Sequence, residues 1–393
     1  MNWRGIFYLG SRYLARNRAK TILLISAFTL VWLLPAAIAL VVSEVEEKLR
    51  SRAADTSLVL GHAGSALELT FNALYFTKPG IAAFPRSEAD ELAQSELASI
   101  IPLYVRYTAG DHRIVGTTLD YFFFRKLAYQ AGRAPVRPGE CVVGAVVAEK
   151  NGISVGDAII SSPETLFDIA GVYPLKMTVC GILEPTGSPD DSAILTDLKT
   201  TWIIEGLGHG HDDAESADKD QLIAQEDDGV IRLNSSIVEY NEITPENIDS
   251  FHFHGEDGGF PITAAIVTPH GVKEQALLKG RFVNSDLRQL IMPTEEMDEL
   301  FATVFAVQRV VLWLLVAVGI GTLAIGAMVF ILSHRLRNEE FQHLRHLGVS
   351  SGTLRGLIAF EGAFVLLSSP VLAGLGLLAL AAVTPTIVER FFG

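Results

Sequence analysis

The chain has 393 residues, a hydrophobic content of 49% and a formal net charge of −14 at pH 7. The charge is unevenly distributed, because residues 44–303 hold 41 of the 45 acidic residues but only 20 of the 31 basic ones. So acidic a segment repels nucleic acid, and a nucleic-acid-binding function is excluded.

The first predicted element is a membrane-spanning helix over residues 21–43, which include no Asp, Glu, Lys or Arg. About 20 apolar residues are enough to cross a bilayer core of about 30 Å. The run is too long for the apolar core of a signal peptide, and no small-residue cleavage site follows it. Five basic residues and no acidic one precede the run, which places the N-terminal segment 1–20 in the cytoplasm.

The predicted topology places residues 44–303 outside the cytoplasm as one large α+β domain. The first helix is expected to extend outwards to about residue 60, and a capping-box pattern at Ser87 predicts a second helix. Helical stretches do not alternate with the strand-like runs, so a βαβ sheet is not expected. Strands are predicted over residues 101–107, 113–118, 141–148, 157–161, 177–183 and 262–268.

Histidines are the one suggestive chemical feature of this domain. Residues 205–230 are rich in Asp, Glu, Ser and Ala and lack Phe, Trp and Tyr, which predicts a mobile loop. Alternate residues of an extended segment point the same way, so an H-x-H pair could present two imidazoles to one Zn²⁺. Incidental histidines in solvated loops remain the alternative. The candidate ligands are His209, His211 and Asp212 in one cluster and His252 and His254 in another.

The two cysteines, Cys141 and Cys180, both lie in this predicted extracytoplasmic domain. The compartment would permit a disulfide. Each cysteine is part of a strand-like run, so two buried free thiols are an equally good interpretation.

Two further spans are predicted over residues 304–333 and 357–388, followed by an extracytoplasmic tail at 389–393. A helix starting at Pro293 is expected to run without a break into the second span. Residues 334–356 between the spans carry four arginines and two glutamates, which agrees with a cytoplasmic loop.

The sequence includes no motif of a catalytic site. There is no phosphate-binding loop G-x-x-x-x-G-K-[ST], no G-x-S-x-G elbow and no H-E-x-x-H. The spans contain almost no ionisable residues, which argues against an ion pathway through them. We therefore expect neither enzymatic activity nor a bound cofactor in this chain.

The cytoplasmic loop predicts a short amphipathic helix. Phe341, Leu344 and Leu347 recur at i, i+3 and i+6, and Gly348 supplies a helix stop. Such a helix between two spans offers a docking surface to a partner protein. A helix lying at the lipid interface is the alternative.

The motif R-x-x-E-F-x-x-L-R-x-L-G from Arg337 to Gly348 resembles the loop of the MacB/FtsX/LolC permeases, membrane subunits of ABC systems. Residues 142–157 and 179–187 resemble stretches of the MacB-like periplasmic domain. The resemblance implies that the loop is the helix that couples the permease to a separate ATP-binding subunit, which would bind ATP and Mg²⁺. The implied coupling residues are Arg337, Glu340, Phe341, Leu344, Leu347 and Gly348.

The family norm is four spans, and this sequence predicts three. The resemblance implies a homodimeric permease that works with a cytoplasmic ATPase, acts on an extracytoplasmic client and resides in the cell (inner) membrane. ATP binding would push on the coupling loop and on the N-terminal basic segment, and the client's chemistry could include zinc. Two alternatives remain: an FtsX-like regulator of an extracytoplasmic cell-wall hydrolase, or an anchored receptor or scaffold without transport.

Overall fold

The computed structural model describes residues 3–77, 80–162, 174–209, 222–225, 231–233, 241–244, 247–248, 251–253 and 257–392. The chain divides into two compact units. Met1–Lys48 and Leu300–Val388 form the first, which we call the membrane unit, while Leu49–Glu299 and Glu389–Gly393 form the second, which we call the outer unit. Three long helices therefore contribute residues to both units.

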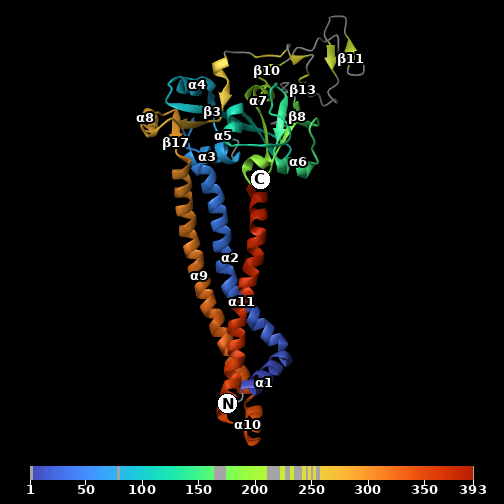
Figure 1. The fold of residues 1–393 in the computed structure, drawn as a ribbon, viewed down its shortest axis with the longest axis vertical. Helices are drawn as coiled ribbons and strands as arrows, with labels where there is room; N and C mark the ends of the chain where they lie inside the picture. Colours follow the sequence, from blue (N-terminus) through green and yellow to red (C-terminus); the bar gives the residue numbers. More distant parts are fainter. Residues whose placement is uncertain are drawn as a thin grey trace. The chain divides into compact units, whose positions relative to one another are not determined.

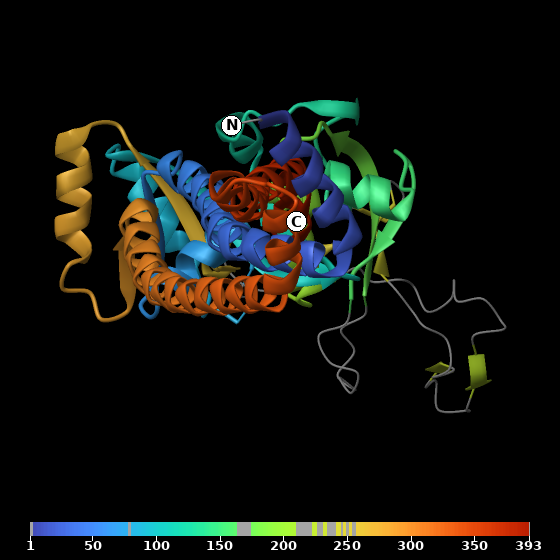
Figure 2. The ribbon, with the colours of Figure 1, turned by 90° about the horizontal axis from the view of Figure 1, so that it is seen from below.

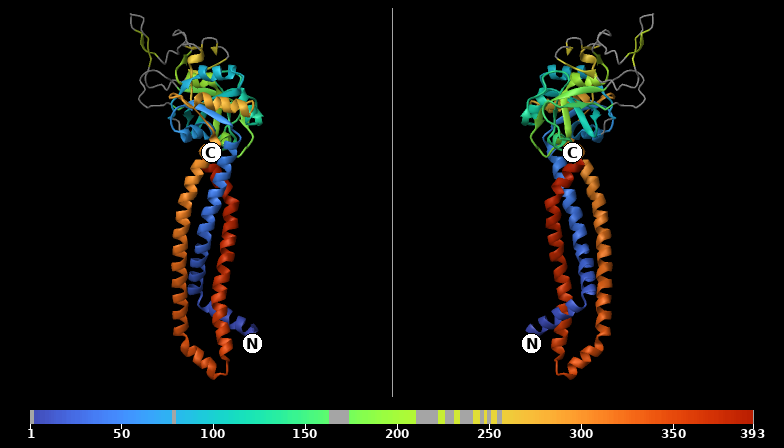
Figure 3. Two further views of the ribbon diagram at one scale, coloured as in Figure 1. Left: turned by 90° about the vertical axis from the view of Figure 1, so that its left-hand side faces the viewer. Right: turned by 90° about the vertical axis from the view of Figure 1, so that its right-hand side faces the viewer.

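The membrane unit is made of helices (Figures 1 and 3). Three of them are long and apolar enough to cross a bilayer, with candidate spans in Arg18–Ala54, Pro293–Leu336 and Ser351–Thr384. Within the described residues, these three candidate spans agree in number with the three expected, and the helix that begins at Pro293 runs unbroken into the second of them. The helices are α1 (Trp3–Arg16), α2 (Arg18–Ala54), α9 (Pro293–Leu336), α10 (Asn338–His346) and α11 (Ser351–Phe392).

Close packing joins these helices where side chains are small. Phe28 of α2 lies against Gly326 of α9, where an added Cβ would come within 2.4 Å of the ring. Phe28 also belongs to a buried cluster with Leu24 and Val365. Figure 2, viewed from below, shows the long helices grouped together with α1 beside them. Glycine at this contact lets the backbone of α9 approach the aromatic ring.

The outer unit is organised around one mixed sheet of eleven strands. Its central path runs β13-β8-β6-β9-β4-β3-β16-β1-β17, while β5 and β7 each pair with β8. The strands are β1 (Leu58–His62), β3 (Ala98–Ala109), β4 (His112–Thr117), β5 (Tyr129–Gly132), β6 (Glu140–Val143), β7 (Ala158–Ile160), β8 (Leu175–Leu183), β9 (Ala193–Asp197), β13 (Asn241–Glu242), β16 (Ala264–Pro269) and β17 (Arg288–Ile291).

Most neighbouring strands are antiparallel, and the β3–β16 ladder pairs Leu103 with Ala264. Three pairs are parallel: β4 with β9, β6 with β8, and β13 with β8. Between β6 and β8 the chain forms α6 (Ala145–Asn151), so a local strand–helix–strand unit exists that the sequence did not predict. Fold class is nonetheless as expected, a helical membrane protein with a large mixed α/β domain.

Short helices cover the sheet and close its core. The core includes Leu58, Tyr104, Trp202 and Ile262, each no more than 2% exposed. Smaller strands pair outside the main sheet. The helices are α3 (Ala66–Tyr75), α4 (Arg86–Gln94), α5 (Leu119–Phe124), α7 (Leu198–Ile204) and α8 (Val272–Phe282), and the smaller strands are β2 (Phe84–Pro85), β10 (Gly208–His209), β11 (Leu222–Gln225), β12 (Ile231–Leu233), β14 (His252–Phe253) and β15 (Pro261–Ile262).

Three local predictions were wrong. The first helix was expected to extend to about residue 60, but α2 ends at Ala54, because the residues from Leu58 pair as strand β1 with β16 and β17. The capping box placed the start of a helix at Ser87, but α4 begins at Arg86 with Pro85 as its N-cap residue and no side-chain cap. Pro85 is held in β2 against β15, and this pairing sets where the helix starts. The strand predicted over residues 141–148 ends at Val143, because Gly144 lies directly against the backbone of Asp190 and Asp191 and a helix follows.

Candidate functional site

The predicted coupling segment folds as α10, which only Arg337 separates from α9. Arg337 is its N-cap residue, and the chain leaves the helix at Gly348 with φ +85°. That conformation is strained for residues with a side chain and favours glycine. Backbone bonds from Gly348 to Arg345 and from Val349 to Leu344 close the end. Gly348 therefore sets the C-terminal end of the short helix.

The apolar stripe of this helix is not used uniformly. Phe341 is 4% exposed and forms a buried cluster with Leu354 and Leu357 of α11, against which Leu344 is half-buried. Leu347, in contrast, is 80% exposed. Phe341 thus packs the helix against α11 of the same unit, while the side chain of Leu347 remains accessible to a binding partner.

Arg337 is the centre of a buried polar cluster. Its Nη1 donates to both carboxylate oxygens of Glu361, at 2.9 and 3.1 Å, and the two side chains are 13% and 5% exposed. Its Cζ lies 3.5 Å from the centre of the Tyr13 ring and 4.8 Å from that of Phe341. Nε bonds to Glu340 at 3.2 Å, although that carboxylate is 67% exposed. Arg337 therefore positions the loop and is largely withdrawn from its surface.

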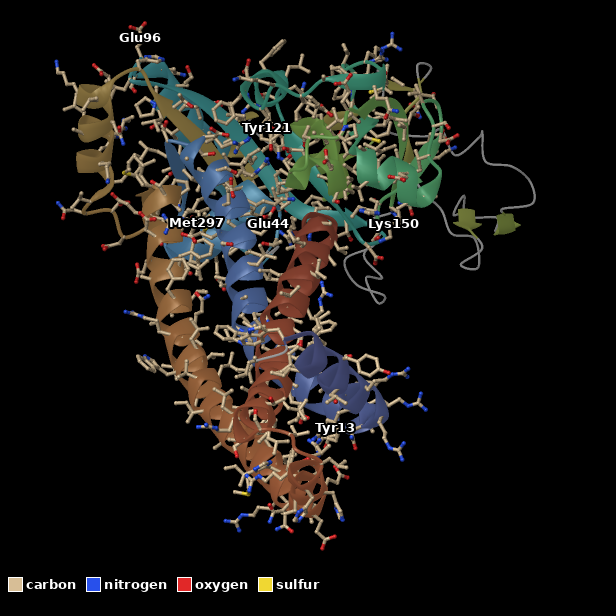
Figure 4. All side chains as sticks on the ribbon, turned by 60° about the horizontal axis from the view of Figure 1, so that its bottom comes forward. Tyr13, Glu44, Glu96, Tyr121, Lys150 and Met297 are labelled. Atoms are coloured by element: carbon tan, nitrogen blue, oxygen red, sulfur yellow. The ribbon has the colours of Figure 1, made fainter. Side chains whose placement is uncertain are left out.

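A second polar contact joins the same region to the start of α2. Lys20 Nζ donates to Ser333 Oγ at 2.7 Å and lies near the Tyr13 hydroxyl, at 3.4 Å. Tyr13 is a residue of α1, as labelled in Figure 4. Four helices, α1, α2, α9 and α11, are thus tied together beside α10. Tyr13, Lys20 and Ser333 carried no sequence signal, since nothing in a linear pattern relates residues more than 300 positions apart.

The outer unit holds its own buried ion pair at the end of α2. Arg52 donates to both oxygens of Asp190, at 2.7 and 3.2 Å, to the Tyr121 hydroxyl at 2.9 Å and to the carbonyl of Leu74 at 2.5 Å. Arg52 is 8% exposed and Asp190 is 1% exposed. Burial alone would raise the pKa of Asp190, but Arg52 outweighs it and the pKa is lowered. Sequence reasoning missed this cluster, because its members are far apart along the chain.

The candidate metal residues fall partly outside the described residues. His211, Asp212 and His254 lie there, while the backbones of His209 and His252 are placed. Strands β10 and β14 are antiparallel, and their register sets His209 directly opposite His252. One residue of each H-x-H pair is therefore paired with the other in the backbone register. Within the described residues, no group of three or more potential metal ligands occurs.

The cysteines are both free and buried. Sγ of Cys180 lies 3.3 Å from the carbonyl oxygen of Cys141, on the neighbouring strand. Burial raises the pKa of the Cys141 thiol well above its usual value and that of Cys180 to about 11. Both thiols are thus protonated and poorly reactive at neutral pH, and the free-thiol alternative describes this structure.

Together, three candidate spans and a mixed-sheet domain define a membrane protein with a large domain outside the bilayer. The profile of the MacB-like periplasmic core domain matches residues 36–236, just over half of the chain. The chain belongs to this MacB-like family of ABC transporter permeases, as the sequence resemblance predicted. In such systems the ATPase activity lies in a cytoplasmic partner subunit.

Two solved structures are similar to the chain. The periplasmic region of MacB from Actinobacillus actinomycetemcomitans is 12% identical, covering 66% of this chain and 97% of that one, with a TM-score of 0.35. The extracellular domain of the noncanonic ABC-type transporter YknZ from Gram-positive bacteria is 13% identical, covering 60% and 99%, with a TM-score of 0.32. Scores this low do not support a shared function. No curated protein matches the sequence.

Proposed function

We propose that this chain couples ATP hydrolysis by a separate cytoplasmic subunit to movement of its own outer unit, which acts on an extracytoplasmic client. The proposal includes a cytoplasmic N-terminus and transport or handling of the client without conduction through the helices. The observation that carries it is the arrangement of α10, which packs on α11 through Phe341 and leaves Leu347 80% exposed.

The seating of α10 favours transmission of force over loose docking. Phe341 is buried against α11, and Arg337 is held by Glu361 and Tyr13. A partner that presses on Leu347 would therefore displace α11 together with α10. An exposed leucine also suits the core of a protein interface, which is apolar and depleted of charged residues.

The end of α2 supplies the matching feature in the outer unit. Arg52 binds Asp190, Tyr121 and the carbonyl of Leu74, which belong to three separate segments of the outer unit. A displacement of residues 49–54 would therefore act on several segments at once. This arrangement supports the proposal that motion of the helix is passed on to the domain.

The docking role of α10 is tested by Leu347→Glu in the full chain, co-expressed with its candidate ATPase. Placing a carboxylate where an apolar anchor docks is expected to weaken co-purification by about tenfold or more, equivalent to about 1.4 kcal/mol or more. Leu336→Glu is the matched control, because Leu336 is 77% exposed but precedes α10. Undiminished co-purification of Leu347→Glu, or an equal loss in the control, would contradict the proposal.

We further propose that the permease is a homodimer, as the family resemblance implies. Native mass spectrometry of the purified chain together with its ATPase is expected to give two copies of each. A single permease copy in an ATPase-active complex would contradict this.

A zinc site is a second, narrower proposal, and the register of β10 with β14 supports it. Directly opposite residues in an antiparallel pair have Cβ atoms about 4.5–5.5 Å apart, which lets two imidazoles share one metal ion. His209→Ala and His252→Ala should each abolish micromolar Zn²⁺ binding, measured by calorimetry on the full chain. His270→Ala is the control, since His270 belongs to the loop after β16. Unchanged Zn²⁺ binding in both variants would contradict the proposal.

A further inference from the structure

Helix α1 carries a continuous basic stripe that no contact within the described residues explains. Arg4, Tyr8, Arg12 and Arg16 recur every four residues, so they share one face of the helix. All four side chains are exposed, and Cζ of Arg12 lies 5.8 Å from the centre of the Tyr8 ring. None of the three arginines pairs with an acidic group of the described chain. The sequence has no acidic residue before Glu44.

The opposite face of α1 is fixed to its own unit. Ile6, Gly10 and Leu14 are buried, again at intervals of four residues. Gly10 lies so close to the Phe360 ring that an added Cβ would come within 2.3 Å of it. The basic stripe therefore has one set orientation, directed away from the rest of the membrane unit. Figure 4 shows nitrogen-tipped side chains extending outward from α1.

Large aromatic and aliphatic side chains within and beside the stripe are also exposed. Trp3 is 68% exposed, Phe7 is 64%, Tyr8 is 59% and Leu9 is 46%. Water alone would be a poor environment for so many at one short helix, whereas aromatic residues favour the boundary between headgroups and acyl chains. Only Asn17 separates α1 from α2, which enters the first candidate span. This helix thus lies near a bilayer surface.

We propose that α1 binds anionic phospholipid headgroups through Arg4, Arg12 and Arg16, with Trp3 and Tyr8 at the level of the headgroups. Guanidinium groups match phosphate oxygens in charge and geometry. The contact would also anchor Tyr13, whose ring lies under Arg337 of the coupling loop. Anionic lipid bound to α1 would therefore also restrain Tyr13, one of the residues that contact Arg337 at the start of α10. The alternative is that α1 binds an acidic face of the ATPase, but this would not explain why the aromatic residues beside the arginines are exposed.

The test uses the full chain reconstituted in phosphatidylcholine vesicles containing about one fifth phosphatidylglycerol. Copolymer nanodiscs are then cut from these vesicles, and the ratio of the two lipids retained per protein is measured by mass spectrometry. The native chain should enrich phosphatidylglycerol. Each arginine near an anionic surface is worth roughly a fivefold preference, so Arg4→Gln, Arg12→Gln and Arg16→Gln together should return the ratio to that of the vesicles.

A matched triple variant controls for charge. Arg335→Gln in α9, Arg345→Gln in α10 and Arg355→Gln in α11 remove the same number of exposed charges from other helices of the membrane unit, and they should leave the enrichment intact. Equal loss in both triples, or no loss in the α1 triple, would overturn the proposal. Loss of ATPase co-purification with unchanged lipid enrichment would instead identify α1 as a protein-docking surface, and would also overturn it.

A measurement on the native chain guards against misinsertion of the variants. Screening shortens the reach of charge from about 10 Å at 0.1 M salt to about 3 Å at 1 M. Enrichment of phosphatidylglycerol should therefore fall at least severalfold between low and high salt. Enrichment that is insensitive to salt would mean that the lipid is held by apolar contacts, and the basic stripe would have no role.

Discussion

The two units of this protein place large apolar side chains in opposite environments. In the outer unit, Trp202 and Tyr104 are buried. In the membrane unit, Trp313 is 73% exposed and Leu378 is 70% exposed, while polar Ser369 is fully buried. Apolar side chains face lipid where lipid is the solvent, and they face one another where water is. Each unit nevertheless has a buried arginine–carboxylate pair among its described residues, Arg52 with Asp190 and Arg337 with Glu361. The effect of burial on the strength of an ion pair can be tested on these two pairs.

The largest expected effect is on the pair in the outer unit. Arg52→Ala would leave Asp190 buried and without its cation, which costs about 3–5 kcal/mol of stability. Hydrogen exchange of α3 and the central strands in the full chain should accelerate accordingly. Replacing both partners, as Arg52→Met with Asp190→Leu, should recover most of the loss, because no charge is then left unpaired. A cost below about 1 kcal/mol for the single change would contradict the role of this pair.

The corresponding change in the membrane unit is Glu361→Gln. It keeps the shape but removes the charge that faces Arg337, and we expect a cost of about 2 kcal/mol. The loss should be local, measured as faster amide exchange in α10. Glu340→Gln is the control, because its carboxylate bonds to the same arginine but is 67% exposed. Equal effects of the two changes would show that burial does not distinguish them.

Sequence predicted the membrane unit better than the outer unit for a physical reason. An uncharged run of more than 20 residues is a local signal, so the spans and the unbroken helix from Pro293 could be read directly. Sheet pairing is not local. The strand predicted through residue 148 gives way to α6 because Gly144 meets the backbone of Asp190 and Asp191, which no local pattern reveals.

The candidate site shows the same limit at the level of single residues. Spacing identified Phe341, Leu344 and Leu347 as one stripe, which is correct for a helix. It could not say that Leu354 and Leu357 of α11 would cover Phe341 and leave Leu347 exposed. Likewise, Arg52 and Asp190 are 138 positions apart, so their pairing is visible only in the fold.

A smaller effect, confined to acid, is expected at Glu140. Its carboxylate accepts from Arg133, at 2.7 and 2.5 Å, and these bonds lower its pKa from 4.5 to about 2. A lowered pKa means that the stabilisation is present above the unfolded value and is lost as pH falls from about 4.5 towards 2. Because Arg133 is 54% exposed, solvent screening limits the contribution to about 1 kcal/mol.

Thermal unfolding of the full chain between pH 2 and 6 measures this effect. Glu140→Gln should lower stability at pH 6 and flatten part of the acid slope. A residual slope is expected from Asp190, whose pKa is also lowered. An acid slope as steep in Glu140→Gln as in the native chain would assign the dependence to other carboxylates.

The smallest effect is expected at the ion pair of Arg50 and Asp298. Its contact distance is similar to that of Arg52 and Asp190, but its side chains are much more exposed. Arg50 Nη1 lies 2.5 Å from Asp298 Oδ1, yet the side chains are 42% and 63% exposed. Water solvates both groups whether or not they pair, so Asp298→Asn should cost less than about 1 kcal/mol. The same hydrogen-exchange measurement that detects Arg52→Ala should show almost no change. A loss matching that of Arg52→Ala would mean that contact distance, and not burial, determines what an ion pair contributes here.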